Sequence, residues 1–391
     1  MSTDRRTRAW LELEASSLRR NFRRIREAVG ASAAIIPMVK ANAYGLGVAE
    51  VVRFLEGEAP WGFGVATTEE GEELRALGIE LPVLVIGPVP PAAYPDLVAA
   101  GLTPGISDLG GLRALAAAAA RAGRPATFHV EIDTGMGRGG FAWRDARTWG
   151  EEVAKLASPG DRLRWSGCFT HFHSADEADD AALLVQRQRF RGALALLPRL
   201  GEGALIHACN SAGALRGPAA TENAVRPGIF LYGGVAGNTL PAPEPVASLR
   251  ARVVFVRDAP EGSTVGYGAT HTASRPERWA TVGIGYGDGL PRALGNRGHA
   301  LVKGRRVPII GRISMDLTVV DITDVQGVEP GDVVTFIGSD GSATISVEEV
   351  ASLASTINYE ILTDFTRRLP RIWLEPEDDG PIIHRLRCGT D

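Results

Sequence analysis

From the N-terminus to about residue 235, short apolar runs alternate with amphipathic stretches. Near-continuous apolar runs are typical of strands that are buried on both faces of a parallel sheet. We expect such strands at 33–39, 62–66, 82–86, 127–132, 163–170 and 204–208. Helical patterns separate them, at 16–28, 48–55, 69–77, 109–122, 145–156 and 178–197. So many β–α units in succession favour an α/β fold with a TIM-type (β/α)8 barrel over an open doubly wound sheet.

The pattern changes after residue 240, where Pro241, Pro243 and Pro245 predict a linker. Beyond it, short β-type runs are separated by Gly and Pro, which is typical of a mostly β domain. Strands are expected at 251–256, 300–302, 307–310, 318–322, 333–337 and 367–373, with one short helix at 348–355. We therefore predict a barrel over residues 12–240 and a β-rich C-terminal domain over residues 241–391, with residues 1–11 as a candidate further strand of that domain. The tail after residue 375 is expected to be a loose end.

Charge and composition restrict the kinds of partner. The net charge of −4 argues against nucleic acid or an anionic membrane as the main partner. The three cysteines, Cys168, Cys209 and Cys388, show no disulfide or metal spacing, so a reducing cytoplasm is expected. The longest uncharged stretch, 227–243, is interrupted by Gly and Pro, and the first ten residues hold three arginines. We expect neither a membrane span nor a secretory signal.

Only three of the 42 basic residues are lysines, so a primary amine has few candidates. Lys155 lies in a helical pattern with Glu151 one turn earlier, which indicates a solvated helix face. Lys303 precedes Gly304 and indicates a hairpin tip. Lys40 ends an apolar strand and precedes a loop, at the end of the barrel where active sites form. Partial desolvation there lowers the pKa of an amine, although a strand-end lysine that reaches solvent fits the same pattern.

Two further motifs follow barrel strands. Residues 135–140 (GMGRGG) match GxGxxG, but the acidic Asp161 lies before the next strand rather than at its end, so a dinucleotide site is not favoured. Arg138 in this loop suits an anionic ligand. His171 and His173 share one face of a strand end, but a clear third metal ligand is missing. We therefore expect no metal site and interpret His171 as packed or stacked on a cofactor.

Other segments indicate anion binding or turns. Asn210 and Ser211 open a helix after a strand, so they form either a phosphate site or an ordinary N-cap. Arg226 to Ile229 closes another strand, where barrels often bind phosphate. Tyr267 and Tyr286 each lie between glycines, which serve turns or leave the tyrosine hydroxyl accessible.

Together these segments resemble those of the alanine racemases, pyridoxal phosphate (PLP) enzymes with a barrel and a β domain. The match covers nearly the whole chain in the right order. In the barrel it includes 38–45 (MVKANAYG), 133–138 (DTGMGR), 170–172 (THF), His207 with 210–211 (NS), and 226–233 (RPGIFLYG). In the C-terminal part it includes 266–270 (GYGAT), 285–289 (GYGDG), 311–316 (GRISMD) and 357–360 (INYE).

The resemblance implies a homodimer in which the subunits share active sites. Lys40 would bind PLP as a Schiff base and act as one of two acid/base groups. Tyr267 of the partner subunit would be the other, on the opposite face of the substrate. Met315 of the partner subunit would help seat the substrate carboxylate, and the residues supporting this side of the site would be Tyr286, Arg292 and Asp316.

The resemblance also implies the groups that hold PLP. His171 would pack by the ring, Arg226 would face the pyridine nitrogen, and Arg138 would contact the phenolate oxygen and the substrate. The phosphate would be held by Tyr44, Ser211, Gly228, Ile229 and Tyr359, and Asn210 would be a further cofactor-binding residue. Racemisation removes a proton from one face of Cα and delivers one to the other, so two bases must flank one carbon. An arginine cannot protonate the pyridine nitrogen, which favours proton exchange over decarboxylation.

Three positions depart from the family pattern. Leu46 stands where His is usual and Ser314 where Cys is common, and neither position is catalytic. Glu131 occupies the place of a lysine that many relatives modify with CO₂ to orient the arginine. We expect Glu131 to supply that carboxylate itself and to orient Arg138, although a surface-facing strand residue fits the same pattern.

The leading interpretation is an alanine racemase that supplies D-alanine for peptidoglycan. A racemase with serine or broader specificity is the first alternative, because pockets discriminate poorly at the scale of one methylene. A PLP decarboxylase of the same fold is the second, and Arg226 argues against it. A PLP carrier built on the barrel alone would leave the β domain unexplained, and a metal-dependent hydrolase would need more ligands than His171 and His173 supply.

Overall fold

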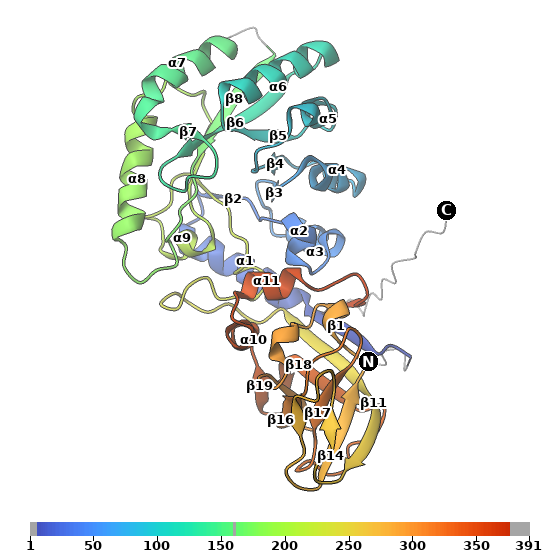
Figure 1. Ribbon diagram of the computed structural model, residues 1–391. Helices are drawn as coiled ribbons and strands as arrows, with labels where there is room; N and C mark the ends of the chain where they lie inside the picture. Colours follow the sequence, from blue (N-terminus) through green and yellow to red (C-terminus); the bar gives the residue numbers. More distant parts are fainter. Residues whose placement is uncertain (1–5, 159–161, 376–391) are drawn as a thin grey trace.

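The computed structural model describes residues 6–158 and 162–375, which form an α/β barrel joined to a mostly β domain (Figure 1). The fold class expected from the sequence is therefore confirmed. The tail after residue 375 and Cys388 lie outside the described residues. In the described part of the chain, no helix has the length and apolarity needed to cross a membrane.

The barrel sheet is parallel throughout. Among the described residues its order is β2-β10-β9-β8-β6-β5-β4-β3, with β7 paired to β6. The bounds are β2 Ala34–Ile35, β3 Phe63–Val65, β4 Val83–Val85, β5 Thr103–Ile106, β6 Ala126–Asp133, β7 Phe141–Ala142, β8 Leu163–Phe169, β9 Leu205–His207 and β10 Ala224–Val225. Nearly every residue of the short strands is buried, as expected for strands covered on both faces.

Backbone hydrogen bonds between the two end strands close this sheet. Met38 and Gly64 form a parallel bridge. The Val39 amide donates to the Gly64 carbonyl at 2.8 Å, and the Gly64 amide donates to the Pro37 carbonyl at 2.8 Å. We expected an unbroken strand over 33–39, but the regular ladder covers only Ala34–Ile35, because Pro37 has no N–H with which to extend it. The bridge carries the strand direction on to the residues that follow.

The helices expected in the barrel are present and end within three residues of the expected positions. Their bounds are α1 Ala15–Val29, α3 Val48–Glu56, α4 Thr68–Ala76, α6 Leu109–Ala122, α7 Ala146–Leu156 and α8 Ala181–Leu194. The sequence did not predict α5 (Tyr94–Ala99) or β5, because α5 is too short for a period and β5 contains Pro104 and Gly105. Further short elements are α2 Lys40–Tyr44, α9 Ser211–Leu215, η1 Pro91–Ala93 and η2 Trp143–Asp145.

The second domain is built on one long sheet. Its order among the described residues is β19-β18-β15-β16-β17-β14-β11-β1-β20. The strands are β1 Ala9–Glu14, β11 Ala247–Ala259, β14 Glu277–Val282, β15 His299–Val302, β16 Arg305–Ile310, β17 Thr318–Asp321, β18 Val333–Asp340, β19 Ala343–Ile345 and β20 Arg371–Leu374. A separate hairpin joins β12 (Thr264–Val265) to β13 (His271–Thr272). The helices are α10 Val347–Ala354, α11 Asn358–Thr363, η3 Tyr286–Asp288 and η4 Arg292–Leu294.

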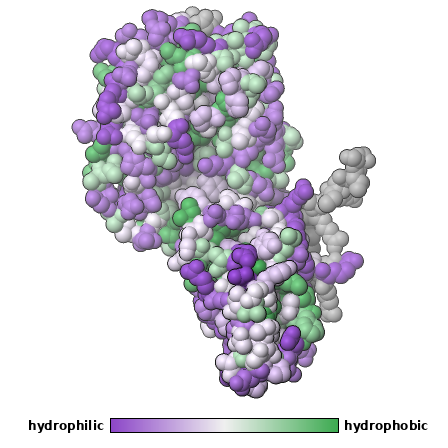
Figure 2. Space-filling view, in the orientation of Figure 1, coloured by the Kyte–Doolittle hydropathy of each residue, from purple (hydrophilic) through white to green (hydrophobic). Residues whose placement is uncertain are grey.

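Strand β1 belongs to this sheet although it begins the described chain. It pairs with β11 in antiparallel and with β20 in parallel orientation. Its last residue, Glu14, is followed directly by α1 of the barrel. The two domains are therefore joined by two separate crossings of the chain, one at Glu14 and one at the segment before β11. Figure 2 shows hydrophobic side chains scattered among polar ones, with several near the junction of the domains.

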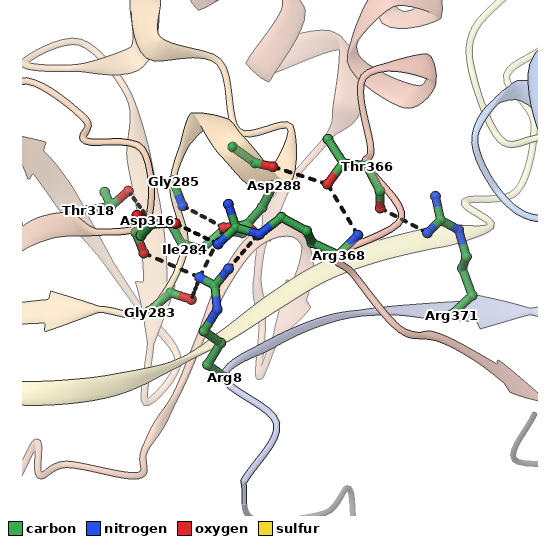
Figure 3. A network of polar contacts seen from close by, with 11 residues as sticks. Arg8, Gly283, Ile284, Gly285, Asp288, Asp316, Thr318, Thr366, Arg368 and Arg371 are labelled. Carbon is green, nitrogen blue, oxygen red and sulfur yellow. Dashed lines mark hydrogen bonds and ion pairs between the residues drawn. The ribbon is translucent and has the colours of Figure 1, made fainter. Parts of the chain in front are cut away.

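A buried ion pair connects the N-terminal segment to the β domain (Figure 3). Asp288 is fully buried, and Arg8 binds both of its oxygens, at 2.6 and 3.0 Å. Arg368 approaches the same carboxylate at 3.3 Å and also binds Asp316 at 2.5 Å. The Asp288 carboxylate also accepts the backbone N–H of Gly285 at 3.0 Å. These contacts hold the loop at 283–289 against the segment at 366–368.

We expect Asp288→Asn to lower the free energy of unfolding by about 2 kcal/mol, because the buried carboxylate loses its charge-assisted hydrogen bonds to the partly exposed Arg8. Urea unfolding followed by tryptophan fluorescence measures this loss. The matched control is Asp324→Asn, which breaks the exposed Arg275–Asp324 pair and should cost less than about 1 kcal/mol. Equal losses in the two variants would contradict a structural role for the buried pair.

Candidate active site

Polar side chains gather at the carboxyl ends of the barrel strands, which meet at one end of the barrel. Lys40 follows β2, Arg138 follows β6, His171 follows β8 and Arg226 follows β10. Arg138, Glu70 and Arg226 all act electrostatically on Lys40, and Lys40 in turn acts on His171. Residues that are up to 186 positions apart in the sequence (Lys40 and Arg226) therefore form one cluster.

The environment of Lys40 favours the neutral amine. Burial lowers the pKa of Lys40, and the positive charges of Arg138 and Arg226 lower it further, while Glu70 opposes them. The other two lysines lie on the surface. Lys155 is paired with Glu152 on α7, and Lys303 occupies the turn between β15 and β16, as the sequence predicted. Among the lysines, Lys40 thus has the setting of a nucleophile or base.

The chain after Lys40 forms a left-handed turn where we expected an open loop. Ala41, Asn42, Ala43 and Tyr44 all have φ between 52 and 55°. This conformation costs roughly 1–2 kcal/mol for each non-glycine residue, so the turn persists only where other contacts hold it. The Asn42 side chain accepts the Val48 amide at 2.9 Å. The carbonyl of the next residue, Gly45, accepts two hydrogen bonds from Arg371, at 2.7 and 3.1 Å.

This turn places Tyr44 against the loop after β10. The Tyr44 ring stacks on Tyr232 at 4.7 Å and lies 6.0 Å from the Tyr359 ring. A Cβ on Gly228 would lie 2.1 Å from the Tyr44 hydroxyl, so only glycine fits there. Burial raises the pKa of Tyr359 to about 12, with a smaller contribution from Asp176, so its phenol remains protonated at neutral pH.

Ser211 joins the same cluster from the start of α9. Its hydroxyl oxygen accepts the backbone N–H groups of Gly228 at 2.8 Å and Phe230 at 3.3 Å. Asn210 caps α9 by accepting the Gly213 amide at 3.0 Å, and Ile229 packs beneath Gly234. The structure therefore brings together all the residues expected to bind a phosphate. The N-cap interpretation of Asn210 also holds.

Arg226 is the most deeply buried cation of the site, with only 3% of its surface exposed. Its Nη1 donates to His207 Nδ1 at 2.5 Å and to the His207 carbonyl at 3.0 Å. Its Nη2 donates to the carbonyls of Thr170 at 2.8 Å and Ala208 at 3.3 Å. Within the described chain, the Nε–H of Arg226 makes no hydrogen bond, so this donor is left for a ligand.

Behind Arg226 lies a chain of buried histidines that the sequence did not identify. His207 Nδ1 accepts from Arg226, so the His207 proton must lie on Nε2, where it is donated to His129 Nδ1 at 2.8 Å. Burial, with the charge of Arg226, lowers the pKa of His129 and of His171 to about 3 each and holds the pKa of His207 well below its usual value. All three rings are therefore neutral at pH 7.

Glu131 lies beneath the glycine loop that carries Arg138. Its Oε2 accepts the Ser107 hydroxyl at 2.7 Å, and a Cβ on Gly139 would lie 2.9 Å from the same oxygen. Burial raises the pKa of Glu131, against the Ser107 hydrogen bond and the charge of Arg138. In the described ranges, Glu131 and Arg138 share no hydrogen bond, so they interact as charges at longer range. Glu131 is buried, which excludes the surface-facing strand position.

The remaining candidates lie in the β domain. Tyr267, between β12 and β13, is 69% exposed and Met315 is 52% exposed. Tyr286 begins η3 and Arg292 begins η4, while Asp316 is paired with Arg368. No contact within the described part of this single chain connects Tyr267 or Met315 with Lys40. A single chain therefore holds two separate groups of candidate residues.

Several residues that build the site escaped the sequence analysis. They are Glu70, Ser107, His129 and Tyr232, together with the part played by His207. The partner of each residue lies far away in the sequence, so no local sequence pattern could predict the contact. For example, the Tyr232 hydroxyl donates to the Met38 carbonyl at 2.8 Å. Across residues 6–158 and 162–375, no three His, Cys, Asp or Glu side chains are grouped closely enough to hold a metal ion.

Comparison with known proteins gives consistent similarities across both domains. The family model for the N-terminal domain of alanine racemase matches residues 13–236, and the model for the C-terminal domain matches residues 246–373. An alanine racemase from Carboxydothermus hydrogenoformans is 39% identical over 370 residues, which are 93% of this chain and 99% of that protein.

Solved structures show the same similarity. The alanine racemase from D-cycloserine-producing Streptomyces lavendulae has a TM-score of 0.89 and 30% identity, covering 95% of this chain and 98% of that one. The alanine racemase from Bartonella henselae, described with covalently bound pyridoxal phosphate, has a TM-score of 0.85 and 28% identity, covering 94% of this chain and 99% of that one.

The buried histidines predict an acid-sensitive fold. Their folded pKa values lie below the unfolded value of about 6.5, so the unfolded chain takes up protons first as the pH falls. Stability should therefore fall progressively from about pH 6.5 towards pH 3. In His129→Asn, Oδ1 can accept from His207 in place of Nδ1, and one titrating group is removed. We expect the slope of unfolding free energy against pH, measured in urea between pH 5 and 6.5, to decrease by about 1 kcal/mol per unit on average, because the unfolded histidine is only half protonated at pH 6.5. An unchanged slope would contradict the burial of a neutral His129.

Proposed function

Because this chain belongs to the alanine racemase family of isomerases, we propose that it interconverts L-alanine and D-alanine, with Lys40 and Tyr267 of the partner subunit as the two proton-transferring groups. The observation that carries the proposal is the partly buried amine of Lys40 at the carboxyl end of β2, where burial and the charges of Arg138 and Arg226 lower its pKa. A neutral amine in that setting can both attach a carbonyl compound and accept a proton.

The described side chains fit PLP. An anionic, planar cofactor needs a covalent anchor, a phosphate cradle and a donor at its far side. Lys40 supplies the anchor, and the cradle is formed by Tyr44, Ser211, Gly228, Ile229 and Tyr359. The Nε–H of Arg226, which has no partner within the described residues, supplies the donor. When bound, PLP provides an electron sink that makes the Cα–H bond of an amino acid acidic.

Two bases on opposite faces of one carbon require the partner subunit. Lys40 belongs to the barrel, whereas Tyr267 and Met315 are exposed on the β domain and separate from it. Exposed aromatic and methionine side chains are enriched at protein interfaces. We propose a homodimer in which the β domain of each subunit completes the site of the other. There, Tyr267 would exchange its proton on the face opposite Lys40, and Met315, supported by Tyr286, Arg292 and Asp316, would seat the substrate carboxylate.

Arg226 favours racemisation over decarboxylation. It is committed to the rings of His207 and His171 and to three backbone carbonyls, and burial lowers its pKa only to about 10, so it stays charged at neutral pH. A permanently charged donor cannot give its proton to the ring nitrogen of PLP, so the electron sink remains weak. A weak sink suits reversible exchange of one proton. His207 and His129 hold this arginine in place by accepting and relaying its hydrogen bond.

Glu131 has a proposed role of its own. Its carboxylate supports the glycine loop from below, is oriented by Ser107, and acts on Arg138 as an opposite charge. We propose that it steadies Arg138 without any need for a modified lysine.

We further propose that the D-alanine serves peptidoglycan synthesis in the cytoplasm. The buried thiols of Cys168 and Cys209, which form no disulfide, are consistent with that location.

Proton NMR in heavy water tests the reaction. With PLP and a panel of L-amino acids, the signal of the Cα proton of alanine should disappear fastest. Faster exchange with serine would show that serine and not alanine is the preferred substrate, and no exchange with any amino acid would refute racemisation.

Lys40→Ala should lose the absorption of covalently bound PLP and all activity. Tyr267→Phe should keep that absorption and exchange from one face only. Equal loss of exchange for L- and D-alanine in Tyr267→Phe would contradict the two-base assignment.

Glu131→Gln tests the charge beneath Arg138. The amide can keep the Ser107 hydrogen bond but carries no charge, so we expect kcat/KM to fall about tenfold or more through misplacement of Arg138. Ser107→Ala keeps the charge and should cost less. Steady-state racemisation rates compare the two variants, and unchanged activity in Glu131→Gln would refute this role.

A further inference from the structure

The carboxylate of Glu70 joins two loops that follow neighbouring barrel strands. Glu70 lies in the first turn of α4, and its Oε1 accepts the backbone N–H of Ala41 at 2.6 Å. Its Oε2 accepts the backbone N–H groups of Ala66 at 2.7 Å and Thr67 at 3.3 Å. Ala41 directly follows Lys40, and Ala66 directly follows β3. The side chain therefore spans the place where β2 and β3 close the barrel.

Capping of α4 accounts for only part of this arrangement. Thr67 is the N-cap residue, and its hydroxyl accepts the Glu70 amide at 3.2 Å, while Oε2 of Glu70 accepts the Thr67 amide in return. This reciprocal pair is a capping box, and it uses Oε2 alone. Oε1 is directed instead at Ala41, which lies 29 residues earlier. The second oxygen thus has a contact that helix capping does not require.

Only a carboxylate can make both contacts. An ionised Glu offers two accepting oxygens, whereas Gln offers one oxygen and one donating NH₂ group. Because every partner of Glu70 named above is a backbone N–H, an amide would turn a donor towards a donor at one of the two places. Two backbone N–H groups converge on Oε2 and only one on Oε1, so the Gln oxygen is expected to face Ala66 and Thr67 and its NH₂ group to face Ala41. Glu70→Gln therefore removes the Ala41 anchor even though its shape is nearly the same.

The turn that Glu70 anchors is the strained one. Residues 41–44 all have positive φ, and such conformations persist only where their surroundings over-determine them. Asn42 and Arg371 hold the far side of the turn, through the Val48 amide and the Gly45 carbonyl. Glu70 holds the near side, at the peptide group next to Lys40.

The charge of Glu70 also acts on Lys40. Burial and the cations Arg138 and Arg226 lower the pKa of Lys40, and Glu70 is the anion that opposes them. Position and charge therefore come from one side chain. We propose that Glu70 is a positioning residue for the racemase reaction. By accepting the Ala41 amide, it fixes the backbone next to Lys40 and thereby the orientation of the Lys40 side chain. This inference rests on the proposed function of Lys40, whereas the anchor itself can be measured without it.

Three variants of the full-length protein separate the possible roles. Glu70→Gln removes one anchor and the charge. Thr67→Ala removes the hydroxyl of the capping box but leaves the Ala41 contact. Glu72→Gln removes the same charge from an exposed position on the same helix.

Hydrogen–deuterium exchange of the peptide covering residues 40–46 measures the anchor directly. We expect faster exchange there in Glu70→Gln and unchanged exchange in Thr67→Ala and Glu72→Gln. In the same samples, Thr67→Ala should increase exchange only in the first turn of α4.

Steady-state kinetics with L-alanine measure the consequence for the reaction. A misplaced reacting group lowers kcat by about 10- to 100-fold, with KM changed by less than about threefold. We expect this split in Glu70→Gln and values within about twofold of the unaltered chain in the other two variants. A purely structural role would instead reduce the amount of folded protein and leave kcat per folded site unchanged.

The inference is overturned if exchange over residues 40–46 is unchanged in Glu70→Gln, if Thr67→Ala reproduces the effect, or if exchange rises while kcat stays the same. A different failure would show that the proposed function is wrong: the unaltered chain would racemise no amino acid, yet the exchange comparison would still report whether Glu70 anchors the turn.

Discussion

The active end of the barrel depends on the hydrogen bonds that close the sheet between β2 and β3. These bonds join Pro37 and Val39 to Gly64, immediately before Lys40. Without closure, the ends of eight strands would not face a common centre, and Lys40 would have no fixed relation to Arg138 or Arg226. The residues that follow the closing hydrogen bonds form a strained left-handed turn, in which four successive non-glycine residues have positive φ. Contacts from α4, α11 and β20 all converge on this turn, which indicates how closely the fold controls its geometry.

The site contains several positive charges, and neutral hydrogen-bond acceptors stabilise the most deeply buried one, Arg226. Among the described residues no carboxylate forms a hydrogen bond with the buried Arg226, whose donors go to backbone carbonyls and to histidine rings, while Glu131 acts on it only as a charge. Because Arg226 only donates, it sets the tautomers of His207 and His129 in turn. Together with burial, the charges of Arg138 and Arg226 lower the pKa of Lys40, which favours the neutral amine. An anionic cofactor would relieve this excess of charge, which is the physical reason that the site suits PLP.

We propose that the β domain contributes its chemistry to the barrel of a partner subunit and not to its own. Its candidate residues, Tyr267 and Met315, are exposed. The Met315 carbonyl accepts the Gly287 amide at 2.8 Å, in the loop that the buried Asp288 carboxylate holds in place. Strand β1 connects the two domains, because it pairs with β11 in the β domain and leads directly into α1 of the barrel.

The sequence by itself determined the alternation of strands and helices, the change to a β domain after residue 240, and the isolation of Lys40 among three lysines. These features are local periods and residue counts, so they need no knowledge of distant contacts. The motif at 38–45, which contains Lys40, also indicated the family. What the sequence could not predict depends on pairs far apart in the chain: the anchor from Glu70 to Ala41, the bond from Ser107 to Glu131, and the relay from Arg226 to His129. Only the tertiary structure decided these, because a strand that closes a barrel brings together residues that share no local pattern.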